Sequence, residues 1–222
     1  DIDCASGFCQ KTNINDAEGV CVDKTYISDF SPTSAAIGDF VSIIGKNFGA
    51  NKGHVYFAKV KNPDIKLLAD WVEAQVADCG PGFNNCSDNQ IIVLVPNGVI
   101  DGKIAVFNAK AVGLDNFNVK YFDTTGDGFK KVPNFILSNI PHPGICGLLP
   151  NQGPVGKDFS IKGKNFGAYD IVKSSIIFGD NTKAKIVGGA AGWTDTLILS
   201  IVPVTLGNGE YGVKVTNNNQ SS

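Results

Sequence analysis

Apolar and polar residues alternate in short runs along most of the chain. The run at 26–30 (Tyr-Ile-Ser-Asp-Phe) and the run at 54–60 show this period of two, which is typical of a β-strand with one buried face. The run at 90–95 is almost entirely apolar, which predicts a strand buried on both faces. The pattern predicts an all-β protein with one short helical turn at 62–69. The other predicted strands are 39–44, 71–76, 103–107, 117–122, one that begins at Phe135, 157–162, 175–178, 183–187, 197–202 and 211–216.

One hexapeptide, Gly-Lys-Asn-Phe-Gly-Ala, occurs twice, at 45–50 and again 118 residues later at 163–168. Ser31-Pro32 and Leu149-Pro150 keep the same spacing, whereas the matching segments 87–96 and 194–203 lie 107 residues apart. The chain therefore contains two copies of one unit, of which the first is longer. Each copy is long enough for the core of one sandwich. We expect two β-sandwiches in tandem.

The expected division of the chain follows from this repeat. Residues 1–23 form a Cys-rich segment with too few apolar residues for a core of its own, so disulfides must order it. Residues 24–122 form the first sandwich, and the polar, Gly-containing stretch 123–133 is a linker. Residues 134–222 form the second sandwich.

The second copy differs from the first at its end. In the first copy the strand at 104–108 is followed by the alternating run 117–121, whereas the matching strand at 213–217 is followed only by a short polar tail. The second sandwich is therefore expected to lack its closing strand. The open edge, at Val213, Val215 and Asn217, is a template for strand addition. Either the chain continues beyond Ser222, or another segment supplies the missing strand.

Composition supports the all-β interpretation and excludes several functions. The chain has 26 Gly and 10 Pro, and Glu occurs only at Glu18, Glu73 and Glu210. The net charge is −2 and every basic residue is Lys, so the usual bidentate reader of phosphate and guanine is missing and no nucleic-acid partner is expected. No apolar run is long enough to span a bilayer, so no membrane insertion is expected. The chain has no Met and no signal peptide, which suggests a mature or excised product.

The number of cysteines is even, and none has a His at metal-site spacing. Disulfides are therefore expected, and they place the protein outside the cytoplasm, at a cell surface or beyond it. Cys79 and Cys86 flank a Gly-Pro-Gly loop and could close on each other. One further bridge is favoured within the amino-terminal segment and one from that segment to the second sandwich, although the sequence does not fix the connectivity. The cysteines involved are Cys4, Cys9, Cys21, Cys79, Cys86 and Cys146.

Both copies carry the same ordered set of features. A strand ends in Ser-Pro or Leu-Pro, a Gly precedes the next strand, and Gly-x-Asn-Phe-Gly follows it. Later come Ser/Thr-Asp, an apolar strand ending in Val-Pro, a Gly-rich turn and a strand ending in Asn. This set resembles the IPT/TIG domain over residues 25–122 and 134–217. The resemblance implies an immunoglobulin-like β-sandwich, a module of cell-surface receptors, bacterial surface proteins, polysaccharide-degrading enzymes and transcription factors, so it implies a fold rather than a function.

The shared motif has a structural interpretation. Its two glycines, Gly45 and Gly49 in the first copy, suit turns that need a positive φ or a close approach of two backbones. Phe48 and its counterpart Phe166 are expected to plug the end of each sandwich.

One run resembles a calcium loop. Asp123, Thr125, Asp127 and Gly128 match the first positions of an EF-hand loop, although Thr is a poor ligand and Asn134 stands where the bidentate Glu should be. The alternative is a plain linker turn. No other cofactor is expected.

Catalytic and sugar-binding residues are sparse. His54 and His142 are the only imidazoles, and neither lies in a nucleophile motif, so we expect no enzyme activity. Trp71 and Tyr169 could form a platform on which a sugar stacks, although aromatic residues in alternating strands more often belong to a core.

The sequence thus predicts a non-catalytic, extracellular structural or adhesive protein. The main hypothesis is a subunit of a surface filament that self-associates head to tail through the open edge, because heterologous contacts of this kind make open fibres. The neighbour in such a fibre could also be another domain of a longer chain. The alternative is a carbohydrate-binding accessory region of a larger secreted enzyme or adhesin, whose partner is a glycan.

Overall fold

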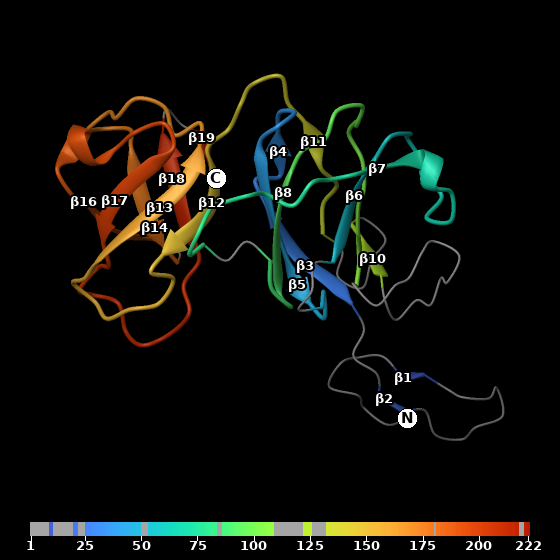
Figure 1. Ribbon diagram of the computed structural model, residues 1–222, viewed down its shortest axis with the longest axis horizontal. Coiled ribbons are helices and arrows are strands. Elements are labelled where there is room, and N and C mark those ends of the chain that lie inside the picture. The colour runs from blue at the N-terminus through green and yellow to red at the C-terminus, as the bar shows by residue number, and fades with distance from the viewer. Residues whose placement is uncertain are drawn as a thin grey trace.

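The computed structural model describes residues 9–10, 20–21, 25–49, 53–83, 86–108, 122–125, 132–179, 181–217 and 220–222. Two immunoglobulin-like β-sandwiches lie side by side, the first blue to green and the second yellow to red in Figure 1. In the amino-terminal segment, β1 (Cys9–Gln10) pairs antiparallel with β2 (Val20–Cys21), and the register sets Cys9 opposite Cys21. Cys4 lies outside the described residues.

The first sandwich consists of two antiparallel sheets. One has the order β3-β5-β8 and the other β10-β9-β6-β7. Alternate residues of β5 point into the space between the sheets, as the pattern predicted, and Val41 and Ile43 are fully buried there. The strands are β3 (Tyr26–Ser31), β5 (Phe40–Lys46), β6 (His54–Ala58), β7 (Trp71–Glu73), β8 (Gln90–Leu94), β9 (Ile104–Phe107) and β10 (Phe122–Thr124). The 3₁₀ turn η1 (Leu68–Asp70) overlaps only the last two residues of the stretch 62–69, where a helical turn was predicted.

The second sandwich repeats this plan with sheets of order β12-β13-β17-β16 and β15-β14-β18-β19. Its core is centred on Ile161, Phe166, Ile176, Ile198 and Val215, each fully buried. The strands are β12 (Gly144–Leu149), β13 (Asp158–Lys164), β14 (Ser175–Phe178), β15 (Thr182–Lys183), β16 (Lys185–Ile186), β17 (Leu197–Ile201), β18 (Val213–Asn217) and β19 (Gln220–Ser221), and a 3₁₀ turn, η2 (Gly189–Gly192), precedes β17.

The segment around Phe135 belongs to the first sandwich, not to the second. Phe135 is buried in the first core with its ring edge-on to Phe57, and β11 (Ile136–Leu137) pairs in parallel with β4 (Ser34–Ala35). The prediction of a first strand of the second sandwich at Phe135 is therefore wrong, and β12 takes that place. Two glycines interrupt the alternation of apolar and polar residues in β12, so this strand does not show the period of two that is typical of a strand with one buried face.

The repeated hexapeptide does the same structural work in both copies. A Cβ on Gly45 would lie 2.0 Å from the carbonyl oxygen of Tyr26, and one on Gly163 would lie 2.1 Å from that of Gly144. Gly49 and Gly167 have φ of +87° and +68°. These values confirm both expected reasons for the glycines, a close backbone approach and a positive φ. Phe48 and Phe166 are fully buried, and the Ser31-Pro32 and Leu149-Pro150 bonds are both cis.

The edge of β18 is not open where the sequence predicted it to be. Beyond Asn217 the chain turns back, so that β19 pairs antiparallel with β18, Thr216 opposite Ser221 and Asn217 opposite Gln220. The Ser222 N–H donates to the Val215 carbonyl oxygen at 3.0 Å, and the Val215 N–H donates to Ser222 Oγ at 2.9 Å. The polar tail itself supplies the strand that pairs with Val215 and Asn217. Val213 at the start of β18 lines a cleft between the two sandwiches.

The disulfide differs from the predicted one. Cys79, in the loop after β7, bonds to Cys146 in β12 and so joins the two sandwiches, whereas Cys86 has a free thiol. The predicted bridges from Cys79 to Cys86 and from the amino-terminal segment to Cys146 are therefore wrong. The physical reason is the docking of β12 against the first sandwich, which brings Cys146 within a Cα–Cα distance of 5.5 Å of Cys79.

Replacing Gly163 by Ala tests the close backbone approach. The added methyl would lie 2.1 Å from the Gly144 oxygen and 2.3 Å from Phe166 Cζ, so β12 and β13 would have to separate. We expect the free energy of unfolding in urea to fall by about 2–3 kcal/mol. Gly153→Ala is the matched control, since its Cβ would meet nothing within 4 Å, and it should change stability by less than about 0.5 kcal/mol. Equal stability of the two variants would contradict the packing.

Peptide mapping of the unreduced protein tests the disulfide. We expect a peptide in which Cys79 is linked to Cys146, and alkylation of Cys86 before any reductant is added. A link between Cys79 and Cys86 would instead restore the bridge that the sequence suggested.

Candidate functional site

A buried carboxylate ties the two sandwiches together. Asp39, 3% exposed and immediately before β5, accepts hydrogen bonds from the Ala36 N–H at 2.8 Å, the His142 N–H at 2.9 Å and Asn165 Nδ2 at 2.7 Å. Two of these three donors belong to the segment that leads into the second sandwich or to that sandwich itself. Asn165 Nδ2 also donates to the His142 carbonyl oxygen at 3.1 Å. Because a buried carboxylate is costly without partners, these bonds favour one relative placement of the sandwiches.

Two aromatic residues of the first sandwich fit against glycines of β12. A Cβ on Gly144 would lie 2.9 Å from Phe40 Cβ, and one on Gly147 would lie 2.7 Å from Phe83 Cδ1. Lys164 covers the Phe40 ring, its Nζ 4.7 Å from the ring centroid, and donates to the Gly38 carbonyl oxygen. These contacts surround the disulfide, so the junction combines apolar packing, a covalent bond and charge-assisted hydrogen bonds.

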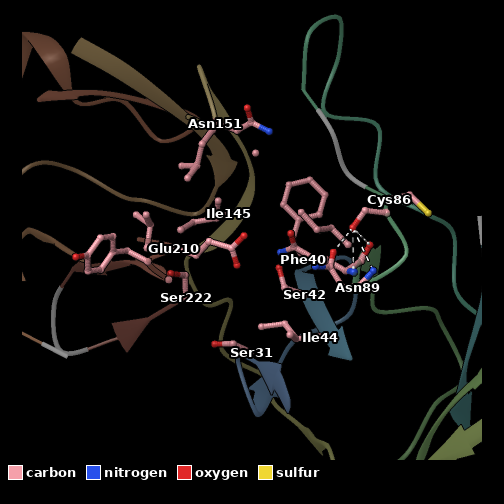
Figure 2. A pocket seen from close by; sticks show the side chains of 18 of the residues that line it. Ser31, Phe40, Ser42, Ile44, Cys86, Asn89, Ile145, Asn151, Glu210 and Ser222 are labelled. Carbon is pink, nitrogen blue, oxygen red and sulfur yellow. Dashed lines mark hydrogen bonds between the residues drawn. The ribbon is translucent and has the colours of Figure 1, made fainter. Parts of the chain in front are cut away.

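A cleft of about 590 Å³ opens beside this junction, between the outer face of the β3-β5-β8 sheet and the second sandwich. Its volume lies in the range of small-molecule sites. Figure 2 shows Asn151 and Glu210 of the second sandwich extending toward the strand that carries Phe40 and Ser42. The first wall also includes Ser31, Ile44, Ser87, Asn89, Gln90 and Ile92, and the second includes Ile145, Leu148, Tyr211, Val213 and Ser222.

The cleft carries hydrogen-bonding groups that the protein does not use. Within the described part of the chain, the side chains of Ser42, Asn151 and Glu210 make no hydrogen bond or ion pair. On the first wall, Ser87 Oγ donates to Asn89 Oδ1 at 2.7 Å, which orients that amide. The site therefore offers a hydroxyl, amides and a carboxylate beside the apolar surface of Phe40.

The charge of the cleft limits its ligands. Glu210 provides the one carboxylate among the described lining residues, and these include neither Lys nor His, so nothing there would neutralise a phosphate or sulfate. On the first wall the β8 edge offers no free place for a peptide strand, because Val76 bridges to Val93 and the Ala77 N–H donates to the Ile92 oxygen. The arrangement suits an uncharged ligand rich in hydroxyl groups.

The predicted sugar platform does not form. Trp71 is 6% exposed and its Nε1 donates to the Asp64 oxygen at 2.8 Å, so its ring is part of the first sandwich. Tyr169 packs on Trp193 in the second sandwich, with 5.9 Å between ring centroids. Asn217 is also occupied, because its Nδ2 donates to the Phe166 and Ala168 oxygens at 2.6 and 3.0 Å.

The predicted calcium loop lies only partly within the described residues. Asp123 belongs to β10, opposite Val106, and Thr125 is fully buried. The Thr125 Oγ1 accepts from the Ile104 N–H at 2.8 Å, which leaves it little capacity to bind a metal. Asp127 lies outside the described residues, and no group of three or more His, Cys, Asp or Glu in the described part could hold a metal ion. The loop stays a prediction, with its third ligand already engaged.

One cluster of titratable side chains lies on the opposite sheet of the first sandwich. His54 Nδ1 is 2.6 Å from Glu73 Oε1, both side chains being about half exposed. Burial raises the pKa of Tyr56, and the charge of Glu73 and a hydrogen bond to it raise it further. The pair does not line the cleft. His142 serves the junction through its backbone, while its own Nδ1 is buried without a partner in the described part of the chain.

The sequence did not point to the cleft residues. Phe40, Ile44 and Ile92 point outward from the first sandwich, and their alternation with buried residues was visible in the printed sequence. Apolar residues on both faces of a strand indicate that both faces are covered, which is the signal that could have found the interface. Glu210 and Asn151 lie in loops, where the sequence carries no such periodicity.

Comparison with known families identifies one domain. Residues 143–222, which form the second sandwich, match the IPT/TIG domain. No curated protein sequence matches the chain.

Several solved structures are similar to the chain at low identity. The surface glycan-binding protein PbSGBP-B from Prevotella bryantii is 16% identical, with 97% of this chain and 40% of that chain covered and a TM-score of 0.30. SGBP-B from a complex xyloglucan utilization locus in Bacteroides uniformis is 16% identical, with 89% and 47% covered and a TM-score of 0.27. The gamma-CGTase from alkalophilic Bacillus clarkii is 16% identical, with 83% and 22% covered and a TM-score of 0.32.

The chain spans less than half of the length of each of these structures. TM-scores near 0.3 define no shared site. No helix in the described residues has the length and apolar character that crossing a bilayer requires.

Replacing Asp39 by Ala tests the junction. The Ala36 and His142 N–H groups and Asn165 Nδ2 would lose a buried acceptor, so we expect the free energy of unfolding in urea to fall by about 2–3 kcal/mol. With the disulfide also reduced, small-angle X-ray scattering should show a broader distribution of distances between the sandwiches. Exposed Asp29, whose carboxylate accepts from the Phe30 N–H, is the control position for Ala. If Asp39→Ala together with reduction of the disulfide left the distribution of distances unchanged, Asp39 would not hold the junction.

Proposed function

We propose that the chain is a non-catalytic glycan-binding region and that the cleft between the sandwiches is its binding site. The observation that carries the proposal is the set of unused polar side chains facing the cleft, Ser42, Asn151 and Glu210, beside the apolar surface of Phe40. Sugars present hydroxyl groups around an apolar ring face, so they need both kinds of surface in one site. Amide and carboxylate groups can pair with neighbouring hydroxyls of one sugar, because each offers two polar atoms.

The junction supports this proposal because it holds the two walls of the cleft in place. A site made by two bodies loses affinity if their relative motion must be frozen on binding. The disulfide and the bonds to Asp39 lie next to the cleft and reduce this motion before any ligand arrives. Nothing in the site calls for a metal or a cofactor, and binding by hydroxyl recognition requires no catalytic group.

An extracellular location fits the same features. The Cys79–Cys146 bridge links two sandwiches and would be stable in an oxidising compartment. We therefore propose a secreted or surface-attached protein in which this chain acts beside other domains. The filament hypothesis loses its motivation, because β19 pairs with the part of β18 that was predicted to be free.

A glycan array followed by calorimetry tests the proposal. We expect the full chain to bind at least one class of neutral glycan. Glu210→Gln and Asn151→Ala should each weaken that binding about five- to tenfold, the loss expected for a hydrogen bond in a partly exposed site. Both side chains are exposed and have no partner among the described residues, so neither variant should change the melting temperature.

Matched controls exist elsewhere on the first sandwich. Glu73→Gln and Asn62→Ala alter the same residue types outside the cleft and should leave the affinity unchanged. An array without any bound glycan, or equal losses in the control variants, would refute the proposed site.

A further inference from the structure

A second cavity, of about 640 Å³, lies at the end of the second sandwich and adjoins the cleft. It is formed by the β12–β13 connection on one side and the β17–β18 connection on the other, with Phe159 and Phe178 beneath them. These two rings pack edge-on, their centroids 5.4 Å apart, and both are buried, so the floor of this cavity belongs to the core.

The two cavities share part of their lining. Five residues border both, which makes them neighbouring sections of one depression rather than separate sites. The shared residues are Leu148, Asn151, Glu210, Tyr211 and Val213. A ligand that fills the cleft and leaves it on this side therefore passes Glu210 and Tyr211.

Tyr211 is held in place at this boundary and keeps part of its ring exposed. Its Oη donates to the Gly207 carbonyl oxygen at 3.2 Å, and its ring lies next to Gly179 and Gly209, which have no side chains to cover it. The side chain is 38% exposed. An amphipathic ring fixed at its polar end is suited to stacking against the apolar face of a sugar.

The second cavity offers amide and apolar groups like those of the cleft, and its lining also includes the oppositely charged Lys157 and Asp158. Amide side chains come from Asn151, Gln152 and Asn208, and apolar surface from Pro154 and Val155. Within the described residues, the side chains of Gln152 and Asn208 make no hydrogen bond or ion pair. Each cavity alone has the size of a small-ligand site.

We infer that the ligand is an extended, neutral oligosaccharide whose chain runs from the cleft across Tyr211 into the cavity at the end of the second sandwich. The inference rests on the proposed function and adds to it a length requirement and a second binding section. A single sugar or a disaccharide would fill one section and leave the other empty. A longer chain would contact both sections and stack on the ring between them.

Calorimetry with chains of different length tests this inference. The probes are the dimer, tetramer and hexamer of the cello-, malto- and chito-oligosaccharide series. For a series that binds, we expect affinity to rise about tenfold or more from dimer to hexamer, because the added units gain contacts within one binding event. Tyr211→Ala should remove most of this gain and leave the dimer within about threefold, while Tyr211→Phe should preserve it, since stacking needs only the ring.

Variants at the far end separate this inference from the proposed function. Asn208→Ala and Gln152→Ala should weaken the hexamer and leave the dimer unchanged, and Asn62→Ala should affect neither. Thermal melting of each variant shows whether the fold is intact. A hexamer that binds no tighter than the dimer, or equal losses for dimer and hexamer in Tyr211→Ala, would overturn the extended site while the cleft still binds. Absence of binding for every length would instead refute the proposed function itself.

Discussion

The carboxylate of Asp39 and the disulfide beside it determine how the two sandwiches are arranged. Each sandwich has its own core, so either could fold without the other, and nothing in those cores prescribes a relative orientation. The orientation comes from a buried charge that needs donors from both bodies and from a covalent bond between the loop after β7 and β12. Because a buried carboxylate loses much of its stabilisation when one donor is removed, small rotations of the junction are costly. The cleft owes its shape to this constraint.

The two sandwiches share the turn that covers each core, whereas the junction between them depends on a residue that only the first copy has. In both copies the Asp after Ser87 or Thr194 accepts the N–H of a positive-φ glycine, which closes the turn of the hexapeptide over the buried Phe. Asn165 in the second copy uses the same turn and also reaches Asp39. Position 39 is Asp in the first copy and Lys157 in the second, so the acceptor exists once. Asn165, in a turn that the second sandwich needs in order to fold, thus also donates a hydrogen bond across the interface.

Local patterns predicted much of the fold and little of the site. The alternation of apolar and polar residues predicted most strands of both sandwiches. The spacing of the hexapeptide predicted two sandwiches with equivalent turns. Alternation failed at β12, where Gly144 and Gly147 interrupt the apolar pattern. Phe40, through its backbone and Cβ, and the Phe83 side chain occupy the space that larger residues at these two positions would need. Local patterns also failed for the cysteines, since the partner of Cys79 depends on docking between bodies and not on nearness in the chain. The closing strand was missed because a polar tail can pair through its backbone, which hydrophobic periodicity does not report.

In a chain of repeated modules, function can arise where two modules meet. Trp71 and Trp193 are committed to their own sandwiches, because a large aromatic ring contributes most to stability when buried. Polar side chains that no core requires can face the space between two modules, because the paired walls of this space form only when the modules dock. Ser42 faces this space from one body and Glu210 from the other, and neither has a protein partner in the described residues. A rigid junction turns such unpaired groups into a preorganised site, whereas a flexible one would leave them as ordinary surface.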